Sequence, residues 1–133
     1  MEVPNTDDHL AANALHAAEV FLQRHAFDAD SVACVTIAPR AGVGVWQPGR
    51  ASVSMLATID DAGAELCEAA APVAQRVLRE LAITEHEAIT AACLAGARLQ
   101  LLLAPATGEA ALRLTGNGGA VEVGRVAVER NLH

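Results

Sequence analysis

Two neighbouring segments near the end of the chain, residues 97–105 and 109–116, alternate between apolar and polar positions. In the second segment Leu112 and Leu114 flank Arg113, and the first segment places leucines at every other position in the same way. Successive side chains of a β-strand point to opposite faces of a sheet, so a period of two is typical of strands with one buried and one wet face. Antiparallel sheets commonly have one such wet face, so the pattern predicts an antiparallel meander.

Three further segments complete the predicted sheet. Residues 32–38 (VACVTIA) are rich in β-branched side chains, and the turn sequence PRAG leads from them into residues 43–46 (VGVW), which predicts a hairpin. Residues 86–96 end at a glycine that separates them from residues 97–105, and we expect them to form the first strand of the meander. The sequence therefore predicts five strands.

Two segments have the apolar period of a helix. Residues 7–26 place apolar side chains at helical spacing, and residues 60–81 do so more strongly, after Asp60 and Asp61 as a capping pair. Pro72 lies inside the second segment, where it either kinks the helix or marks the first turn of its regular part. We therefore predict one helix before the hairpin and one between the hairpin and the meander.

Two other segments have a mixed pattern. Residues 47–58 fit a third strand, a loop or an early helical turn, and the prediction leaves them open. Residues 120–133 place Val121, Val128 and Leu132 at helical spacing, although the valines also fit a strand. We expect a short C-terminal helix there.

These elements predict a single α+β domain over residues 1–133. The predicted order is α-β-β-α-β-β-β-α, with a five-stranded antiparallel sheet and helices on its faces. The hydrophobic fraction is 53% and the charged fraction 19%, so the chain has enough apolar material for a core and lacks the composition of a disordered segment.

Charge and cysteine usage limit the classes of partner and compartment. The formal net charge is −7 and the chain has no lysine, which argues against binding to nucleic acid or to an anionic membrane surface. Cys34, Cys67 and Cys93 are widely spaced in apolar runs, so we expect buried, reduced and inert thiols. The N-terminus lacks the features of a signal peptide, and no strongly apolar stretch reaches the ~20 residues of a membrane helix. We therefore expect a cytoplasmic protein.

The clusters of reactive residues are weak candidates for chemistry. Glu85, His86 and Glu87 are consecutive, and in the predicted strand their side chains would point to opposite faces rather than converge on one ion. His9 and His16 could share a helix face, but no acid or cysteine completes a ligand set there. The sequence therefore predicts no catalytic residue, no cofactor site and no metal site, and the chain is not expected to be an enzyme.

The order and spacing of these elements resemble the Roadblock/LC7 family over residues 7–132. The resemblance is carried by ACVTIAPRAGVGVW, which is similar to the first hairpin of the family, and by LRELAITEHEAITAACLAGARLQLLLAPATGEAALRLTGNGGAVEVGRVAVERNL, which is similar to its second helix, meander and closing helix. The chain departs from the family in the segment 47–58, in Pro72 and in the hairpin turn, which usually reads Asp-Gly. The resemblance implies a profilin-like fold and a dimer that pairs the second helices and joins two sheets edge to edge. It also implies a non-enzymatic scaffold or regulator that binds a small Ras-like GTPase.

This resemblance and the apolar face of the 60–81 helix give two sets of candidate residues. The candidate dimer interface, with a second copy or a related chain, is Leu66, Ala70, Val73, Ala74, Val77 and Leu81. The alternative is that the same face serves the core of the chain itself. The candidate partner-binding residues are Arg40, Trp46 and Arg50, which lie in or beside the hairpin, and a core or rim position is the alternative for Trp46.

Two other functions remain open. One is a structural adaptor subunit that never meets a GTPase, which a pull-down in different nucleotide states distinguishes from a GTPase regulator. The other is a small-ligand sensor or enzyme of profilin-like fold, which a deep pocket lined by cysteine, histidine and acids would favour and a filled core would count against.

Overall fold

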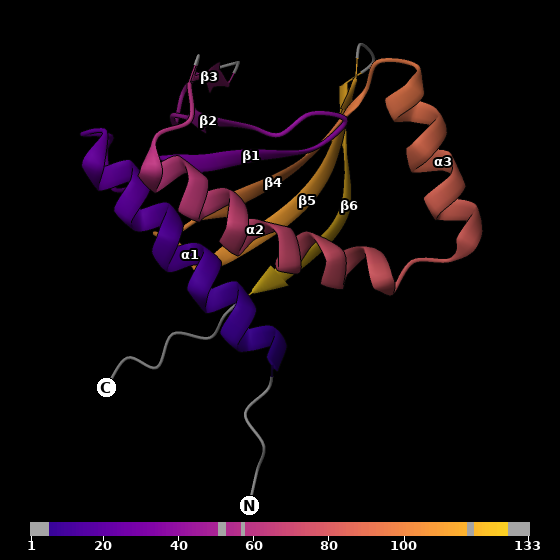
Figure 1. Cartoon of the computed structure of the whole chain (residues 1–133), viewed down its shortest axis with the longest axis horizontal. Helices are drawn as coiled ribbons and strands as arrows, with labels where there is room; N and C mark the ends of the chain where they lie inside the picture. Colours follow the sequence, from indigo (N-terminus) through magenta and orange to yellow (C-terminus); the bar gives the residue numbers. More distant parts are fainter. Residues whose placement is uncertain (1–5, 51–52, 57, 117–118, 128–133) are drawn as a thin grey trace, which may run out of the picture.

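The computed structural model describes residues 6–50, 53–56, 58–116 and 119–127, and these form three helices and a six-stranded antiparallel sheet (Figure 1). The strands lie side by side in the order β3-β2-β1-β4-β5-β6. In chain order the elements are α1 (Thr6–Arg24), β1 (Val32–Ala38), β2 (Gly42–Trp46), β3 (Ser54–Met55), α2 (Asp61–Arg79), α3 (Ile83–Leu94), β4 (Arg98–Ala104), β5 (Glu109–Gly116) and β6 (Gly119–Ala127). The α+β class and the antiparallel sheet agree with the sequence prediction.

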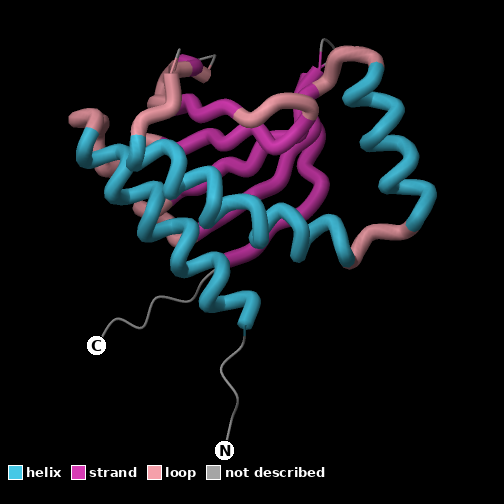
Figure 2. Tube along the Cα trace, viewed as in Figure 1, coloured by secondary structure: helices cyan, strands magenta, loops and turns pink. Residues whose placement is uncertain are grey.

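The molecule has two layers, because α1 and α2 pack side by side on one face of the sheet (Figure 2). The leucines that alternate along β4 point into this interface, and Leu101 and Leu103 are completely buried there. Phe21 of α1 and Leu66 of α2 meet them from the helix layer and are equally buried. The single hydrophobic core therefore lies between the two helices and one face of the sheet.

The start of α2 is held by a side-chain cap. Asp60 accepts a hydrogen bond from the backbone N–H of Gly63 at 2.8 Å, which satisfies one of the free donors of the first turn. The other carboxylate oxygen of Asp60 lies 2.9 Å from Nε2 of His25, just beyond α1. The hydrogen bond from Gly63, followed by the charge of His25, lowers the pKa of Asp60. This cap therefore ties the end of α1 to the beginning of α2.

Six predicted elements are confirmed by the structure. The helices predicted over 7–26 and 60–81 are α1 and α2, the predicted hairpin is β1 and β2, and the segments 97–105 and 109–116 are β4 and β5. Pro72 lies inside α2 and not in its first turn, because the helix begins eleven positions earlier at Asp61. The local apolar period and the turn residues were sufficient to predict these elements.

The prediction of a strand over residues 86–96 is wrong, because the structure has the helix α3 there. Ala82 precedes the helix in an extended conformation, and the hydroxyl of Thr90 donates a hydrogen bond to the carbonyl of His86 one turn earlier. Alanine, which recurs through this segment, has the highest helix propensity of all residues. None of the residues of α3 is buried, so the helix lacks the one-sided apolar period that would have identified it.

The prediction of a C-terminal helix is also wrong, because Gly119–Ala127 forms the edge strand β6. The strand pairs with β5, and its valines suit an extended backbone. Gly124 packs directly against Val77 of α2, at a distance that only a residue without Cβ allows. Residues 128–133 of the predicted helix lie outside the described part of the chain.

The open segment 47–58 contributes the two-residue strand β3, which pairs with β2 through Ser54 and Met55. Together with α3 and β6 this changes the element order to α-β-β-β-α-α-β-β-β. The predicted five-stranded order with a closing helix is therefore corrected to a six-stranded one. Both long helices lie on the same face, which leaves the opposite face of the sheet uncovered by α1, α2 and α3.

Candidate functional site

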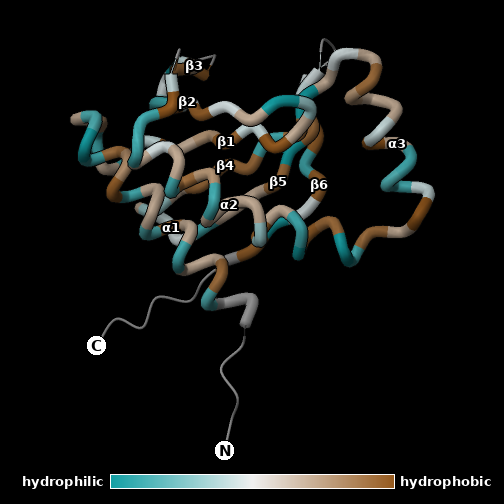
Figure 3. The backbone as a smooth tube through the Cα atoms, viewed as in Figure 1, coloured by the Kyte–Doolittle hydropathy of each residue, from teal (hydrophilic) through white to brown (hydrophobic). Residues whose placement is uncertain are grey.

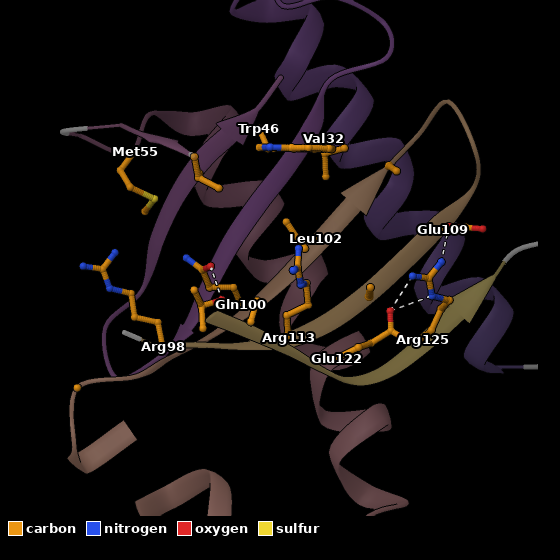
Figure 4. Close-up of a pocket in the computed structure, with 17 residues that line it drawn as sticks. Val32, Trp46, Met55, Arg98, Gln100, Leu102, Glu109, Arg113, Glu122 and Arg125 are labelled. Carbon is orange, nitrogen blue, oxygen red and sulfur yellow. Dashed lines mark hydrogen bonds and ion pairs between the residues drawn. The ribbon is translucent and has the colours of Figure 1, made fainter. Parts of the chain in front are cut away.

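The face of the sheet opposite α1 and α2 carries a groove with a volume of about 870 Å³ (Figure 4). Its floor consists of the residues that alternate with the buried leucines of β4 and β5, such as Gln100, Leu102, Ala111 and Arg113. Trp46 at the end of β2 lines one end of the groove. We call this surface the open face, and all six strands of the sheet contribute to it.

The antiparallel register arranges the side chains of the open face in rows across the strands. One row contains Thr36, Gln100, Arg113 and Glu122, which are successive cross-strand partners on β1, β4, β5 and β6. The adjacent row on one side contains Cys34, Leu102, Ala111 and Arg125, which are successive cross-strand partners on β1, β4, β5 and β6. In the other direction Arg98 is opposite Thr115. The register therefore places polar and charged rows beside an apolar one.

A chain of hydrogen bonds crosses the middle of the open face. Gln100 donates through Nε2 to the hydroxyl of Thr36 at 3.1 Å, and its Oε1 accepts from the hydroxyl of Thr115 at 3.4 Å. Gln100 and Thr36 are both buried, so these bonds satisfy polar groups that would otherwise be costly to bury. The side-chain amide of Gln100 is thus fixed at both ends.

A compact ion-pair cluster joins β6 to the start of β5. Arg125 donates to Oε1 of Glu122 at 2.6 Å and to Oε2 of Glu109 at 2.7 Å. The hydrogen bond with Glu122 and the charges of the two glutamates raise the pKa of Arg125. One arginine therefore holds both of the acidic side chains that line the groove.

The cysteines agree in part with the expectation of buried thiols. Cys34 is completely buried, and burial raises the pKa of its thiol to about 11, an effect that the nearby charge of Arg113 partly opposes. Cys67 and Cys93 are half-buried, and burial also raises the pKa of Cys67. All three are free cysteines. The prediction of buried thiols is therefore confirmed fully for Cys34 alone.

Two of the three predicted partner-binding residues lie together. Trp46 is 37% exposed, and its ring N–H donates to the backbone carbonyl of Arg50 at 2.8 Å. Arg40 lies instead in the β1–β2 turn, where it lines a smaller hollow of about 260 Å³ with Arg98 and Met55. Trp46 is therefore neither a core residue nor isolated on the surface.

The predicted dimer-interface residues face the sheet of their own chain. Five of the six, Leu66, Ala70, Val73, Ala74 and Val77, are buried in the single hydrophobic core, and Leu81 is half-buried beyond the end of α2. This arrangement is the alternative that the sequence left open for the apolar face of the 60–81 helix. Dimerisation itself stays a prediction, and so does the identity of the residues at its interface.

The structure places the two candidate chemical clusters on different helices. Glu85, His86 and Glu87 lie in the first turns of α3, and His9 and His16 are exposed on α1. Within the described ranges, no group of three or more histidine, cysteine, aspartate or glutamate side chains is close enough to hold a metal ion. None of the helices in these ranges is both long and apolar enough to cross a membrane.

Two features of the surface were missed by sequence reasoning. The pairing on the open face depends on side-chain contacts among β1, β4, β5 and β6, which no local pattern contains. The second feature is α3, which exposes Ile83 and Leu94 to 76% and 85% along a shallow hollow of about 400 Å³. Figure 3 shows that hydrophobic and hydrophilic residues follow one another along this helix. The exposed leucine and isoleucine would have been a signal for an interaction surface if the segment had been recognised as a helix.

No protein-family model, curated protein or solved structure matches this chain significantly.

Proposed function

We propose that this chain is a cytoplasmic, dimeric, non-enzymatic scaffold or regulator that binds another protein on its open face. The observation that supports this function is the groove of about 870 Å³ on the sheet face that α1 and α2 do not cover. Trp46 is exposed at one end of the groove, and tryptophan is enriched at the energetic centres of protein interfaces. Half-buried Leu102 and Ala111 provide apolar area beside it.

The composition of the groove favours a protein partner over a small-ligand or catalytic function. Its described lining includes no cysteine or histidine, and its two glutamates are both engaged by Arg125. The core on the other side of the sheet is filled by large side chains such as Phe21 and Leu66. A pocket with converging acids, cysteine and histidine would have favoured a sensor or an enzyme.

The finer identity of the partner rests on the Roadblock/LC7 resemblance alone, which implies a small Ras-like GTPase. Its test is a pull-down of purified Ras-like GTPases loaded with GDP or with a non-hydrolysable GTP analogue. Binding that differs between the two nucleotide states supports a GTPase regulator. Equal binding in both states supports instead a structural adaptor.

The dimer proposal is supported by α3. An isolated helix shorter than ~12–15 residues is only marginally stable in water, and α3 has twelve residues, of which Ile89 and Cys93 pack against the core but none is fully buried. Ile83 and Leu94 are nevertheless apolar and almost fully exposed. A second copy of the chain that covers this side of α3 would bury both residues and stabilise the helix.

Selection from a displayed library of random peptides tests the open face. Peptides that bind the wild-type chain should lose about tenfold or more in affinity with Trp46→Ala, because the exposed indole is expected to contact them. Val20→Ala is the matched control, since Val20 is 38% exposed but lies on α1. Selected peptides that bind the Trp46→Ala variant as tightly as the wild type would contradict an interaction on the open face.

Light scattering tests the dimer. The wild-type chain is expected to have the mass of a dimer at micromolar concentrations, and Leu94→Glu is expected to convert it to a folded monomer by placing a charge on α3. Val20→Glu is the control and should stay dimeric. A monomeric wild type, or a Leu94→Glu variant that stays dimeric, would refute an interface on α3.

A further inference from the structure

Two arginines on the open face, Arg98 and Arg113, lack an acidic partner. Within the described part of the chain, neither guanidinium takes part in a hydrogen bond or an ion pair. Arg98 is exposed and Arg113 is half-buried, and both line the groove. In a chain with a formal net charge of −7, this part of the groove is therefore a local concentration of positive charge.

The register shows why Arg113 is unpaired. Glu122 is its direct cross-strand neighbour on β6, but the carboxylate of Glu122 is held by Arg125. Glu109, the other acid of the groove, is held by the same arginine. Gln100 is the neighbour of Arg113 on β4, and its amide oxygen accepts from Thr115. Every acceptor side chain next to Arg113 in its row is thus already engaged.

Arg98 and Arg113 are diagonal neighbours on the same face. Arg98 pairs with Thr115 and Arg113 with Gln100, so the two arginines lie on adjacent strands two residues out of register. Side chains at such positions are attached to Cα atoms ~7–8 Å apart, within reach of each other for long residues. Figure 4 shows the side chain of Arg98 turned toward Met55 and that of Arg113 turned toward Leu102, with Gln100 between them. Each guanidinium group can therefore donate hydrogen bonds to a carboxylate of its own.

Apolar side chains continue from the arginine pair along the strands. Ala111 precedes Arg113 by two residues on the same face of β5, and Leu102 is opposite Ala111 on β4. Trp46 and Val32 follow toward the next row (Figure 4). Side chains on one face of a strand are ~6.6 Å apart along it, and an extended peptide presents its own alternate side chains at the same interval. The groove therefore matches an extended segment in both spacing and chemistry.

We propose that the open face binds an extended acidic segment of a partner protein, with one carboxylate on Arg98, another on Arg113, and apolar side chains over Leu102 and Trp46. This inference rests on the proposed function and names the chemistry of its partner. Charge complementarity selects the acidic segment, because the unpaired cations attract it while the negative remainder of the chain repels it elsewhere. The apolar row then fixes its register.

Fluorescence anisotropy with a short synthetic peptide tests this proposal. The probe carries two glutamates and then two leucines at alternate positions, with serine between them, and the comparison peptides replace glutamate with glutamine or shuffle the order. We expect saturable binding of the probe that weakens as salt is added, because the contact with the arginines is electrostatic. The glutamine and shuffled peptides should bind about tenfold more weakly or worse.

Variants of the protein locate the contact. Arg113→Gln and Arg98→Gln should each lower the affinity for the probe about tenfold, which corresponds to the loss of one charge-assisted contact. Arg79→Gln is the matched control, because it removes the same charge from a different place. Arg79 is exposed at the end of α2, on the side of the sheet that α1 and α2 cover. Circular dichroism verifies that each variant is folded. If Arg113→Gln does not fold, Arg98→Gln, at the exposed start of β4, still tests the contact.

Several outcomes would overturn the proposal. Loss of affinity in Arg79→Gln equal to that in Arg113→Gln would show a non-specific charge effect, and absence of binding to the probe would show that the face does not recognise this chemistry. Displacement of the probe by free glutarate at equal concentration would indicate a small carboxylate ligand, and displacement by oligo-dT would indicate a nucleic acid. A glutamine peptide that binds as tightly as the probe and still depends on Trp46 would leave the proposed function standing and refute only the acidic partner.

Discussion

The contact between Gly124 of β6 and Val77 of α2 gives a sharp test of the C-terminal half of the fold. A Cβ added at Gly124 would overlap the side chain of Val77, and the backbone at Gly124 does not require a positive φ. Gly124→Ala therefore adds one methyl group to a full core, and such overpacking typically costs about 1–3 kcal/mol. In a helix over residues 120–133 the same substitution would be stabilising by about 1 kcal/mol, so the sign of the effect distinguishes the two structures.

A double-mutant cycle isolates the contact itself. Val77→Ala removes two methyl groups from the core and is expected to cost about 2 kcal/mol from lost burial and a residual cavity. In the double variant the new alanine at 124 fills part of that cavity, so the total cost should be close to that of Val77→Ala alone. The expected coupling is a rescue of about 1–3 kcal/mol relative to the sum of the single variants.

Urea unfolding followed by far-UV circular dichroism measures these free energies, provided that the dependence on denaturant stays the same among variants. Gly116→Ala is the matched control, because Gly116 also lies in a strand, and among the described residues a Cβ there would meet only Ala97, at an ordinary 3.6 Å. It should be neutral or slightly stabilising. A Gly124→Ala variant as stable as Gly116→Ala, or strictly additive effects of the 77 and 124 substitutions, would refute the packing of α2 on β6.

Two further predictions concern titratable groups. Because the folded-state pKa of Asp60 is lowered, its charge stabilises the fold above the ordinary pKa of 3.8, and this stabilisation is lost as the pH falls below that value. Asp60→Asn keeps the helix cap but should flatten the fall of the unfolding free energy at acid pH. An unchanged fall in this variant would contradict the role of the charge. Buried Cys34, with a pKa of about 11, should react with N-ethylmaleimide at pH 8 only after the chain unfolds, whereas half-buried Cys93 should react in the folded chain. Peptide mass spectrometry measures the rate of modification of each cysteine. Equal rates for Cys34 and Cys93 in the folded chain would contradict the burial of Cys34.

The candidate site was only partly accessible from the sequence. Trp46 could be proposed because an isolated tryptophan beside a short strand suggests an interface, and the structure places it on the open face. The importance of Arg98 and Arg113 could not be proposed, because it depends on which acids remain for them after Arg125 has engaged Glu109 and Glu122. Such a choice among neighbours is made by side chains from three strands and leaves no periodic signal.

The apolar face of α2 is a second example of what the sequence could not decide. Its apolar stripe was evident, but a stripe specifies only that the face is buried and not what buries it. The structure places Val73 and Val77 against the sheet of the same chain. A substitution such as Val77→Glu is consequently expected to unfold the chain rather than to separate a dimer.

The sequence by itself determined α1, the β1–β2 hairpin, α2 and the β4–β5 pair, because each has a clear period and residues that favour its ends or turns. The tertiary structure alone decided the other elements. The valines at 121, 123 and 126 fit either state until β5 offered a free edge to pair with, and Gly124 allowed α2 to approach. The alanine-rich α3 has no fully buried residue, and its contacts with the core through half-buried Ile89 and Cys93 produce no clear apolar period; β3 is too short to produce one. Local sequence patterns determine a helix or strand where one face of it is buried at a regular period. Where burial is not regular, long-range pairing between strands and helices decides which element forms.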